Sequence, residues 1–270
     1  MAAFSKAYAK QMAKKFGYFA TWLPTSPLRL GDYGILSKNY IFVRRANVSD
    51  LGIAFDTRGD QTAGSIDYQT SGAVSISVDV TADPNLPSAP IKTKIGFTFS
   101  RKRSVVFKAN GVRVTSIENQ VALGHELRKL LPHSWNKKYR VITELVEADT
   151  TTIIIANSRS SKLELSATGD ISANIDIANA SLKLAVTTQH EMSYTDIAKS
   201  GISPLFLTTG LKSKDGFFRA AAALGGPSPG LDALDLVTDD DIAAHPEEYF
   251  FGKDSLVDLL ADEDVDEDEG

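Results

Sequence analysis

The feature that most constrains the fold of this chain is a pair of segments in which apolar and polar residues alternate. In residues 73–81 the apolar members of the alternation are Val74, Ile76, Val78 and Val80, with serine and aspartate between them. In residues 91–100 they are Ile91, Ile95, Phe97 and Phe99, with lysine and threonine between them. A period of two is typical of a β-strand with one buried face. Because a short Pro-rich connection separates the segments, the sequence predicts a long amphipathic β-hairpin.

A second amphipathic region follows between residues 162 and 188. Its first arm alternates Leu163 and Leu165 with the charged residues Lys162 and Glu164. In its second arm Leu182, Leu184 and Val186 alternate with Lys183 and Ala185. The residues between the arms are rich in Gly, Asn and Asp, so this region fits the two-residue period less well than the first. We predict a second hairpin here.

The remaining elements place this pair in a larger α+β body. We expect an N-terminal amphipathic helix over residues 4–19 and a second helix over Ser116–Leu131. The patterns also predict strands at Tyr40–Arg45, Tyr139–Val146, Thr150–Ala156 and Pro204–Leu207, a loop at Gly59–Ser71, and a tight hairpin turn at Asn110-Gly111. The order of elements predicts a twisted mixed or antiparallel sheet with flanking helices and two long amphipathic hairpin regions.

Charge divides the chain into a basic body and an acidic tail. Residues 1–220 carry 28 Lys and Arg against 18 Asp and Glu, a net charge of +10, whereas residues 221–270 carry one Lys against 16 acidic residues, a net charge of −15. Such asymmetry favours an anionic partner for the basic part, or a tail that masks it. We therefore predict a body over residues 1–219, a linker over 220–231 and an acidic tail over 232–270 that is a candidate mask for the body.

The predicted linker is rich in Ala, Gly and Pro, a composition typical of exposed and protease-sensitive segments. Its candidate cleavage region is marked by Leu224, Gly225, Gly226 and Leu231. The tail beyond it carries apolar residues that are candidates for docking on the body: Tyr249, Phe250, Phe251, Leu256, Leu259 and Leu260.

The N-terminal helix has two opposed stripes. Phe4, Tyr8, Met12 and Phe16 recur at intervals of four residues, and lysines lie roughly opposite them. One interpretation is a helix that packs its aromatic stripe on the body and leaves its lysines in water. The other is a basic amphipathic helix that meets an anionic membrane surface. The two interpretations are compatible if the helix docks first and engages lipid later.

No pattern in the sequence indicates a catalytic or metal site. His125-Glu126 begins like a zinc-binding helix, but Lys129 stands where the second histidine belongs. Residues 226–230 match G-x-S-x-G, yet two prolines prevent the strand–turn–helix that a nucleophile elbow requires. The chain has no cysteine, so thiolate chemistry and zinc–cysteine sites are excluded. We expect no catalytic residues, no cofactor and no metal, and therefore not an enzyme.

Three stretches of the chain resemble the microbial gasdermins, the bacterial and fungal relatives of the animal pore-forming proteins. They are the N-terminal helix with Gly17-Tyr18, Leu23-Pro24 and Arg29-Leu30-Gly31-Asp32; the pair Tyr139–Leu145 and Thr152–Ile155; and Gly201–Phe206. In that family a protease or another trigger relieves inhibition by a C-terminal segment. The body then binds acidic lipid, oligomerises and inserts two amphipathic hairpins as a large transmembrane β-barrel. The resemblance implies anionic membrane lipids, an activating protease and further copies of the chain as partners.

Residue by residue, the resemblance assigns candidate roles. The side chains expected to face lipid are Val74, Ile76, Val78, Ile95, Phe97, Leu163, Leu165, Leu182, Leu184 and Val186. The candidate contacts to anionic lipid are Lys6, Lys10, Lys14, Lys15, Arg101, Lys102 and Arg103. Many bacterial members carry a lipidated N-terminal cysteine, which this chain lacks. We therefore expect anchoring by charge and by the amphipathic helix.

Two other classes of function stay open at this point. One is a non-enzymatic binding or scaffold module whose basic face the tail masks; basic residues interleaved with stacking aromatics are absent from the sequence, so we expect no nucleic-acid partner. The other is a hydrolase with a site assembled from dispersed residues. The N-terminus has no apolar signal core, so we expect the latent protein in the cytoplasm and the activated one at the inner or plasma membrane.

Overall fold

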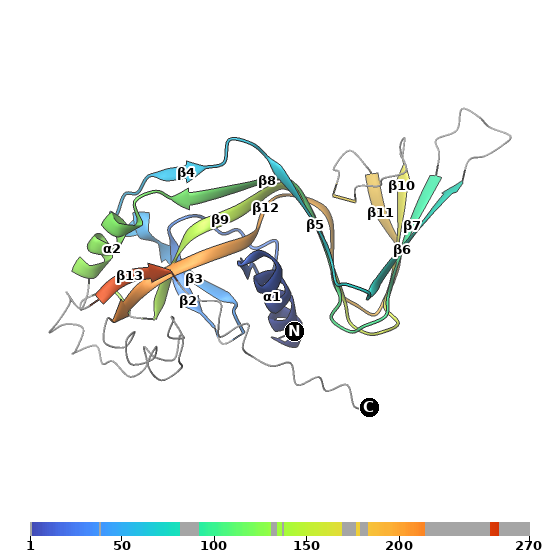
Figure 1. Ribbon diagram of the computed structural model, residues 1–270, viewed down its shortest axis with the longest axis horizontal. Coiled ribbons are helices and arrows are strands. Elements are labelled where there is room, and N and C mark those ends of the chain that lie inside the picture. The colour runs from blue at the N-terminus through green and yellow to red at the C-terminus, as the bar shows by residue number, and fades with distance from the viewer. Residues whose placement is uncertain are drawn as a thin grey trace. The chain divides into compact units, whose positions relative to one another are not determined.

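The computed structural model describes residues 2–37, 39–81, 92–130, 134–136, 138–168, 177–178, 183–213 and 249–253 (Figure 1). Within them lie the helices α1 (Ala2–Phe16) and α2 (Gln120–Lys129) and the 3₁₀ helix η1 (Val48–Leu51). The strands are β1 (Phe19–Ala20), β2 (Asp32–Leu36), β3 (Phe42–Asn47), β4 (Thr57–Gly59), β5 (Gly64–Gln69), β6 (Val74–Thr81), β7 (Lys92–Phe99), β8 (Val105–Ile117), β9 (Tyr139–Ala156), β10 (Lys162–Thr168), β11 (Lys183–His190), β12 (Met192–Ser213) and β13 (Tyr249–Lys253). The α+β class with antiparallel sheets and an N-terminal helix is confirmed.

The chain forms two compact units. Unit 1 comprises Gln61–Arg113 and Glu147–Pro204, and unit 2 comprises Ala2–Asp60, Val114–Val146 and Leu205–Gly270. The long strands β8, β9 and β12 supply residues to both units, because the boundaries fall inside them. Chain order alone does not reveal this division, which runs within the body predicted for residues 1–219.

In unit 2, α1 is built as the spacing of its aromatic residues predicts. Tyr8 and Met12 are fully buried, and Phe4 and Phe16 are half-buried. The helix ends at Gly17, whose φ of 74° is a conformation that glycine adopts at little cost, and the Gly17 amide donates to the carbonyl of Ala13. The aromatic stripe is therefore packed inside the folded unit.

A second core in unit 2 lies under α2. The helix buries Leu123 and Leu127, one turn apart, in a cluster with residues of η1, β8, β9 and β12 and of the loops after η1 and before β9: Val48, Ile53, Ile117, Trp135, Val141 and Leu211. The rings of Tyr33, Trp135 and Tyr139 extend this core, with centroids 5.0 to 5.5 Å apart. These contacts fix the ends of β9 and β12 that enter this unit.

Unit 1 consists of two stacked β-layers. One layer is formed by β5 and parts of β8, β9 and β12, and the other is the four-stranded sheet β6–β7–β10–β11. Between them lies a core of Ile95, Phe97, Phe99, Val106, Ile154, Ala156, Leu163, Leu165 and Ile177. Figure 1 shows the layers meeting at a row of bends, where each strand of one layer continues into a strand of the other.

Two local predictions about β8 and its neighbours are wrong. Asn110-Gly111 makes no hairpin turn: β8 is continuous, and because Gly64 pairs with Val112 while Ser65 pairs with Asn110, Gly111 is the extra residue of a β-bulge. Its φ is 66°, and a Cβ there would lie 2.0 Å from an oxygen of Asp149. The Asn-Gly pair thus provides the positive φ of a bulge rather than that of a turn.

The predicted loop at Gly59–Ser71 contains the end of β4 and all of β5. The side chains of β5 are exposed or half-buried, so this strand needs no apolar alternation. Its backbone pairs with β8, and Asp67 forms an ion pair with Lys108 at 2.7 Å. The polar sequence of β5 therefore gave no sign of a strand, because β5 is held by backbone pairing with β8.

Other elements are found with different bounds. The strands predicted at Tyr139–Val146 and Thr150–Ala156 are one strand, β9, in which Ile153, Ile154 and Ile155 are buried as expected. The helix predicted from Ser116 begins only at Gln120, because the side chain of Asn119 caps it by accepting from the Ala122 amide at 3.0 Å. In the described part of the chain, no helix has the length and apolar character needed to cross a membrane.

Candidate functional site

The two predicted hairpins form one antiparallel sheet in unit 1. β7 pairs with β6 on one side and with β10 on the other, and β10 pairs with β11. The register places the predicted lipid-facing side chains, together with Phe99 and Ala167, opposite one another in cross-strand rows: Val74 with Phe99; Ile76 with Phe97 and Leu163; Val78 with Ile95, Leu165 and Val186; and Ala167 with Leu184. These side chains therefore share one face of the sheet. Leu182 lies outside the described residues.

This apolar face is not evenly covered. On the inner strands β7 and β10, the side chains of Ile95, Phe97, Leu163 and Leu165 are at most 1% exposed. On the outer strands the exposure is 43% for Ile76, 44% for Val78, 57% for Val80 and 45% for Val186. The core between the layers thus covers the middle of the face and leaves its two edges in water.

The opposite face of the same sheet is polar. Exposed side chains there come from all three of the strands β6, β7 and β10: Ser75, Ser77, Asp79, Lys94, Thr98 and Glu164. Asp79 stands opposite Lys94, and Ser75 stands opposite Thr98. Alternation within each strand and the register between strands therefore give a sheet that is apolar on one face and polar on the other.

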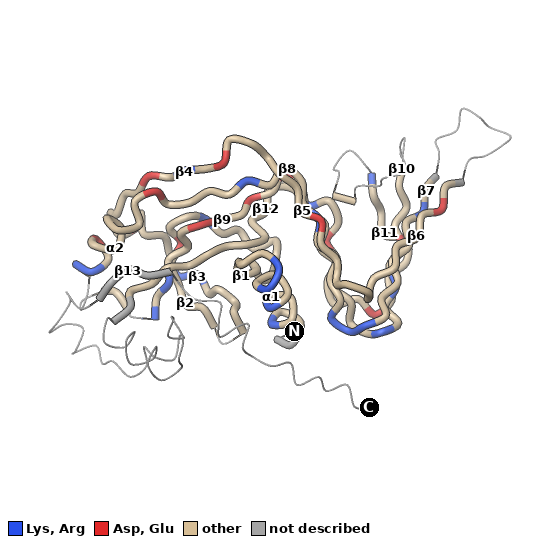
Figure 2. The backbone as a smooth tube through the Cα atoms, viewed as in Figure 1, with Lys and Arg blue, Asp and Glu red and all other residues tan. Residues whose placement is uncertain are grey.

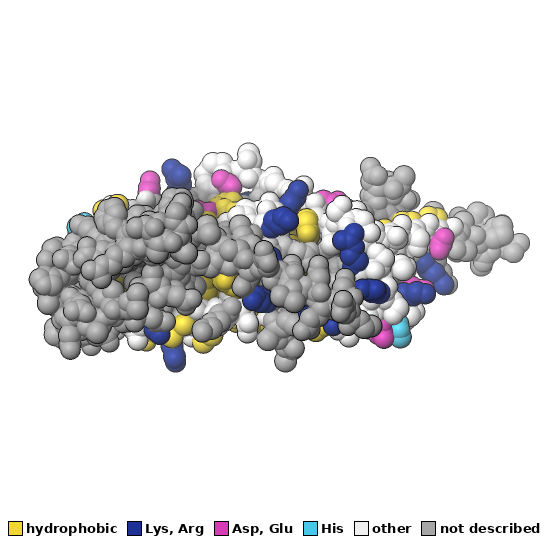
Figure 3. All heavy atoms as spheres, turned by 60° about the horizontal axis from the view of Figure 1, so that its bottom comes forward, with side chains coloured by type: hydrophobic (Ala, Val, Ile, Leu, Met, Phe, Trp, Pro, Cys, Tyr) yellow, Lys and Arg dark blue, Asp and Glu magenta, His cyan; other side chains and the backbone are white. Residues whose placement is uncertain are grey.

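The predicted basic triplet lies in the bend between β7 and β8. Arg101 and Lys102 are exposed, and Arg103 is half-buried. The amide of Arg103 donates to the carbonyl of Ala156 at 3.1 Å, so this bend adjoins the one between β9 and β10, which carries the exposed Arg159. Exposed Lys162 follows at the start of β10. Figures 2 and 3 show Lys and Arg residues gathered on the face that carries the bends.

Sequence reasoning missed Arg159 and Lys162 as members of this basic group. Arg159 is an isolated basic residue among serines, and Lys162 begins a strand of alternating apolar and polar residues. Only the contact between the two bends brings them close to residues 101–103.

The predicted lysines of α1 differ in their surroundings. Lys14 and Lys15, in the last turn, are exposed, whereas Lys6 and Lys10 are half-buried. Two of the four side chains are thus open to an anionic surface while the helix is docked. The lipid role of all seven basic candidates stays a prediction.

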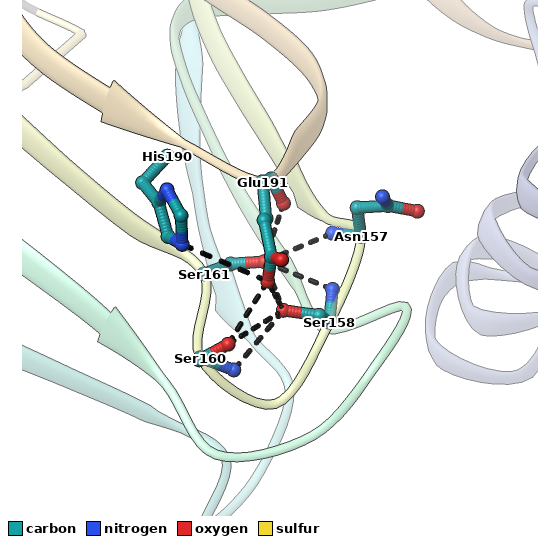
Figure 4. A network of polar contacts seen from close by, with 6 residues as sticks. All are labelled: Asn157, Ser158, Ser160, Ser161, His190 and Glu191. Carbon is teal, nitrogen blue, oxygen red and sulfur yellow. Dashed lines mark hydrogen bonds and ion pairs between the residues drawn. The ribbon is translucent and has the colours of Figure 1, made fainter.

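A polar network fastens the β9–β10 bend to the end of β11 (Figure 4). The carboxylate of Glu191 accepts from the hydroxyls of Ser158 and Ser160, and its backbone carbonyl accepts from the Ser161 hydroxyl and from the Asn157 amide. The hydrogen bonds from Ser158 and then Ser160 hold the pKa of Glu191 below its usual range. The sequence carried no sign of this network, because it joins residues about thirty positions apart.

Part of the acidic tail is placed on unit 2. β13, which contains the predicted anchors Tyr249, Phe250 and Phe251, pairs antiparallel with β12 over Thr209–Ser213. The same strand of unit 2 pairs with β1 a few residues earlier, at Leu205 and Phe206. The other anchors, Leu256, Leu259 and Leu260, and the linker positions Leu224, Gly225, Gly226 and Leu231 lie outside the described residues.

Parts of all three stretches that carry the family resemblance meet in unit 2. Phe19, next to Tyr18, pairs with Phe206, and their rings lie 5.7 Å apart. The Tyr18 hydroxyl donates to Glu144, and burial together with this carboxylate raises the pKa of Tyr18. The amide of Gly31 donates to the carbonyl of Ile142 at 2.9 Å. Segments far apart in sequence therefore form one packed arrangement.

The alternative of an enzyme would need a site with convergent reactive groups. A hollow in unit 1 is lined by Gly111, Arg113, Glu147, Asp149 and Ser203. Within it Arg113 pairs with Asp149 at 3.0 Å and also donates to the carbonyl of Gly111. Among the described residues, no group of three or more His, Asp and Glu side chains is arranged to hold a metal ion.

Comparison with known proteins gives a single kind of likeness. No family model matches the chain, and no curated protein matches it. The chain is similar in structure to a bacterial gasdermin. That protein, from Bradyrhizobium tropiciagri, superposes with a TM-score of 0.33 and 12% sequence identity, over 78% of this chain and 88% of the other. It belongs to the family that the sequence stretches resemble.

Proposed function

We propose that this chain is a latent pore-forming protein. Release of the acidic C-terminal segment allows the body to bind anionic lipid, to oligomerise and to insert the hairpins β6–β7 and β10–β11 as part of a large membrane pore that kills the cell. The observation that carries the proposal is the register of the sheet β6–β7–β10–β11. It aligns apolar side chains on one face and polar side chains on the other across β6, β7 and β10, and Leu184 and Val186 of β11 continue the apolar face. Strands that line a pore in lipid need this alternation.

The uneven burial of the apolar face supports the same conclusion. Ile76, Val78 and Val80 form an exposed apolar row on an outer strand, which is unusual because apolar edge strands favour aggregation. In lipid the same row would be buried, and the outer strand would find a strand of the next subunit. The apolar residues of β6 are thus placed for an environment other than water.

Charge supports the first two steps of the proposal, release of the tail and binding to anionic lipid. The bends of unit 1 present Arg101, Lys102 and Arg159, and the start of β10 presents Lys162; each basic group near an anionic surface contributes on the order of 1 kcal/mol. The tail with its net charge of −15 opposes this attraction, and its strand β13 pairs with β12 of unit 2. Loss of the tail changes the sign of the protein's net charge from −5 to +10 and frees the backbone of β12 that β13 covers.

The test uses the full chain with a specific protease recognition sequence inserted in residues 220–231. The purified protein is added to dye-loaded vesicles of anionic or neutral lipid, and the protease is then added. We expect dye release after cleavage from anionic vesicles, and little release without protease or from neutral vesicles. Complete cleavage without release, over a broad range of protein and lipid concentration, contradicts the proposal. A salt-sensitive gel shift with nucleic acid in place of release would favour the scaffold alternative.

Two matched substitutions separate insertion from lipid binding. Val78→Lys and Ser77→Lys each add one positive charge to β6 at exposed neighbouring positions, but on opposite faces of the sheet. A lysine facing the middle of a bilayer costs about 2–4 kcal/mol, whereas one facing the pore lumen costs little. We expect Val78→Lys to bind vesicles but to lose at least about 90% of the release rate, and Ser77→Lys to keep it. Equal release by the two variants contradicts the assignment of faces.

A further inference from the structure

The two layers of unit 1 have the same strand order. In one layer the order is β5–β8–β9–β12, and in the other it is β6–β7–β10–β11. Each strand of the first layer is joined to the strand at the same place in the second by a short bend. The bends are residues 70–73, 100–104 and 157–161, and the single residue Glu191. Unit 1 is therefore a four-stranded sheet folded over on itself along one line.

Backbone hydrogen bonds connect neighbouring bends along this line. The amide of Ser100 donates to the carbonyl of Ala73 at 3.0 Å, and the amide of Arg103 donates to the carbonyl of Ala156 at 3.1 Å. The amide of Asn157 donates to the carbonyl of Glu191 at 2.9 Å. The four bends thus form a continuous, hydrogen-bonded row.

Three of the four bends contain a residue with positive φ. The values are 63° at Gly72, 64° at Arg103 and 50° at Glu191. Glycine adopts this conformation readily, but side chains such as those of Arg103 and Glu191 make it unfavourable. The bent backbone at Glu191 is therefore strained, and contacts elsewhere must hold it.

Those contacts are the polar network of Figure 4. Ser158 and Ser160 donate to the Glu191 carboxylate, and buried Ser161 donates to its carbonyl. The Ser161 oxygen also accepts from the amides of Asn157 and Ser158 at 3.1 and 2.9 Å. Both the side chain and the backbone of Glu191 are thus held by the neighbouring bend. Straightening β11 into β12 requires these contacts to break.

We infer that the row of bends is a hinge along which the folded sheet opens, and that the contacts of Glu191 with Ser158, Ser160 and Ser161 are the latch that keeps the hinge closed. The inference rests on the proposed function, for which opening of the hinge is the step that releases the hairpins. The core between the layers stabilises the closed sheet independently of the latch. Buried Thr152, which donates to the carbonyl of Ile177 at 2.6 Å, adds to this stabilisation. The latch therefore sets the rate of opening and does not by itself keep unit 1 folded.

The first experiment measures the hinge without any membrane. Amide hydrogen exchange is compared by NMR for the full chain, for Glu191→Ala and for the control Glu164→Ala. Glu164 is also an exposed glutamate with a threonine contact, but that contact, at 3.1 Å from Thr188, lies within one sheet and crosses no bend. The reporter is the amide of Arg103, which lies in the bend between β7 and β8 and donates a hydrogen bond to the carbonyl of Ala156 at the end of β9. It therefore reports on a part of the row that Glu191 does not contact. We expect exchange there to be about three- to tenfold faster in Glu191→Ala, because exposed charge-assisted hydrogen bonds are of modest strength.

The second experiment measures dye release by the same variants in the cleavable chain. We expect Glu191→Ala to release dye about three- to tenfold faster after cleavage, Glu191→Gln to be intermediate because its amide oxygen still accepts, and Glu164→Ala to match the parent. Unchanged exchange in Glu191→Ala overturns the latch, whatever the release rates. Faster exchange with an unchanged release rate overturns the link between hinge and insertion. Release by no variant, the parent included, contradicts the proposed function, and the exchange result then still decides the latch.

Discussion

The outer strand β6 and the inner strand β7 have the same alternating pattern in the sequence, yet the folded protein treats them differently. The apolar side chains of β7 are sealed between the two layers of unit 1, whereas Ile76, Val78 and Val80 of β6 are about half exposed. Ile76 and Phe97 show the contrast most directly, because they are cross-strand neighbours at 43% and 1% exposure. Burial in the folded unit therefore explains the pattern of β7 but leaves that of β6 without a use in water.

The difference indicates that one pattern answers two requirements. The inner strands β7 and β10 provide the core of the folded unit, and the whole face of four strands provides the surface that the proposed pore presents to lipid. A substitution in an inner strand should then damage folding and insertion together. A substitution in an outer strand should damage insertion with little effect on folding.

The largest expected effect is a difference in stability between variants of the cross-strand neighbours Phe97 and Ile76. Phe97→Ala should lower the free energy of unfolding by about 3–5 kcal/mol, because it opens a cavity in the core between the layers. Ile76→Ala should lower it by less than about 1 kcal/mol, because that side chain is already half in water. Urea unfolding of both variants measures the difference. Similar losses in the two variants would contradict the distinction between inner and outer strands.

An intermediate effect is expected at the bend that leads into β6. Gly72 has a φ of 63°, so Gly72→Ala places a side chain in the left-handed region and should cost about 1–2 kcal/mol. The loss should arise from the backbone alone, since the nearest atom to the added Cβ is 3.6 Å away on the Arg101 side chain. Gly64→Ala in β5 is the control, because its Cβ would meet only a carbonyl oxygen at 3.8 Å. The stabilities of both variants are measured by urea unfolding. A larger loss of stability in Gly64→Ala than in Gly72→Ala would refute the assignment of strain.

The smallest expected effect concerns the bend that leads into the inner strand β10. The pKa of Glu191 is below its usual range because Ser158 and Ser160 donate to the carboxylate, so the double variant Ser158→Ala/Ser160→Ala should raise it. A lowered pKa in the folded protein means that this stabilisation is present above the unfolded pKa and lost as the pH falls through the folded one. NMR titration of the Glu191 carboxyl carbon measures the shift. Ser166→Ala, whose hydroxyl contacts Ala185 instead, should leave the titration unchanged.

The sequence predicted both hairpins, the apolar face and the aromatic stripe of α1, because local periodicity determines which side chains share a face. It did not predict which strands are inner, since Ile76 and Phe97 occupy equivalent positions in their patterns. That difference arises from the pairing of β7 with β10, which joins the hairpins over about seventy residues and depends on packing. Periodicity also failed at β5, where exposed polar residues pair through the backbone alone, and at Gly111, where a bulge and a turn share the same dipeptide.

The functional residues divide in the same way. The triplet Arg101-Lys102-Arg103 is visible as a run of charge, whereas Arg159 becomes its neighbour only through the contact between two bends. Glu191 carries no sequence signal, because a single glutamate between two strands is typical of an ordinary exposed turn. Its importance depends on three serines brought to it by the end of β9.

The shared strand order of the two layers has a kinetic consequence. If the folded sheet opens along its row of bends, the pairings of β6 with β7, β7 with β10 and β10 with β11 need not be broken and formed again. Only a few backbone torsions change, so the chain avoids the entropic cost of closing long loops and the slow search for strand partners. The opened sheet would inherit its register from the closed one. Conversion of this protein is then expected to be limited by opening of the hinge and by assembly of the subunits rather than by refolding of its strands.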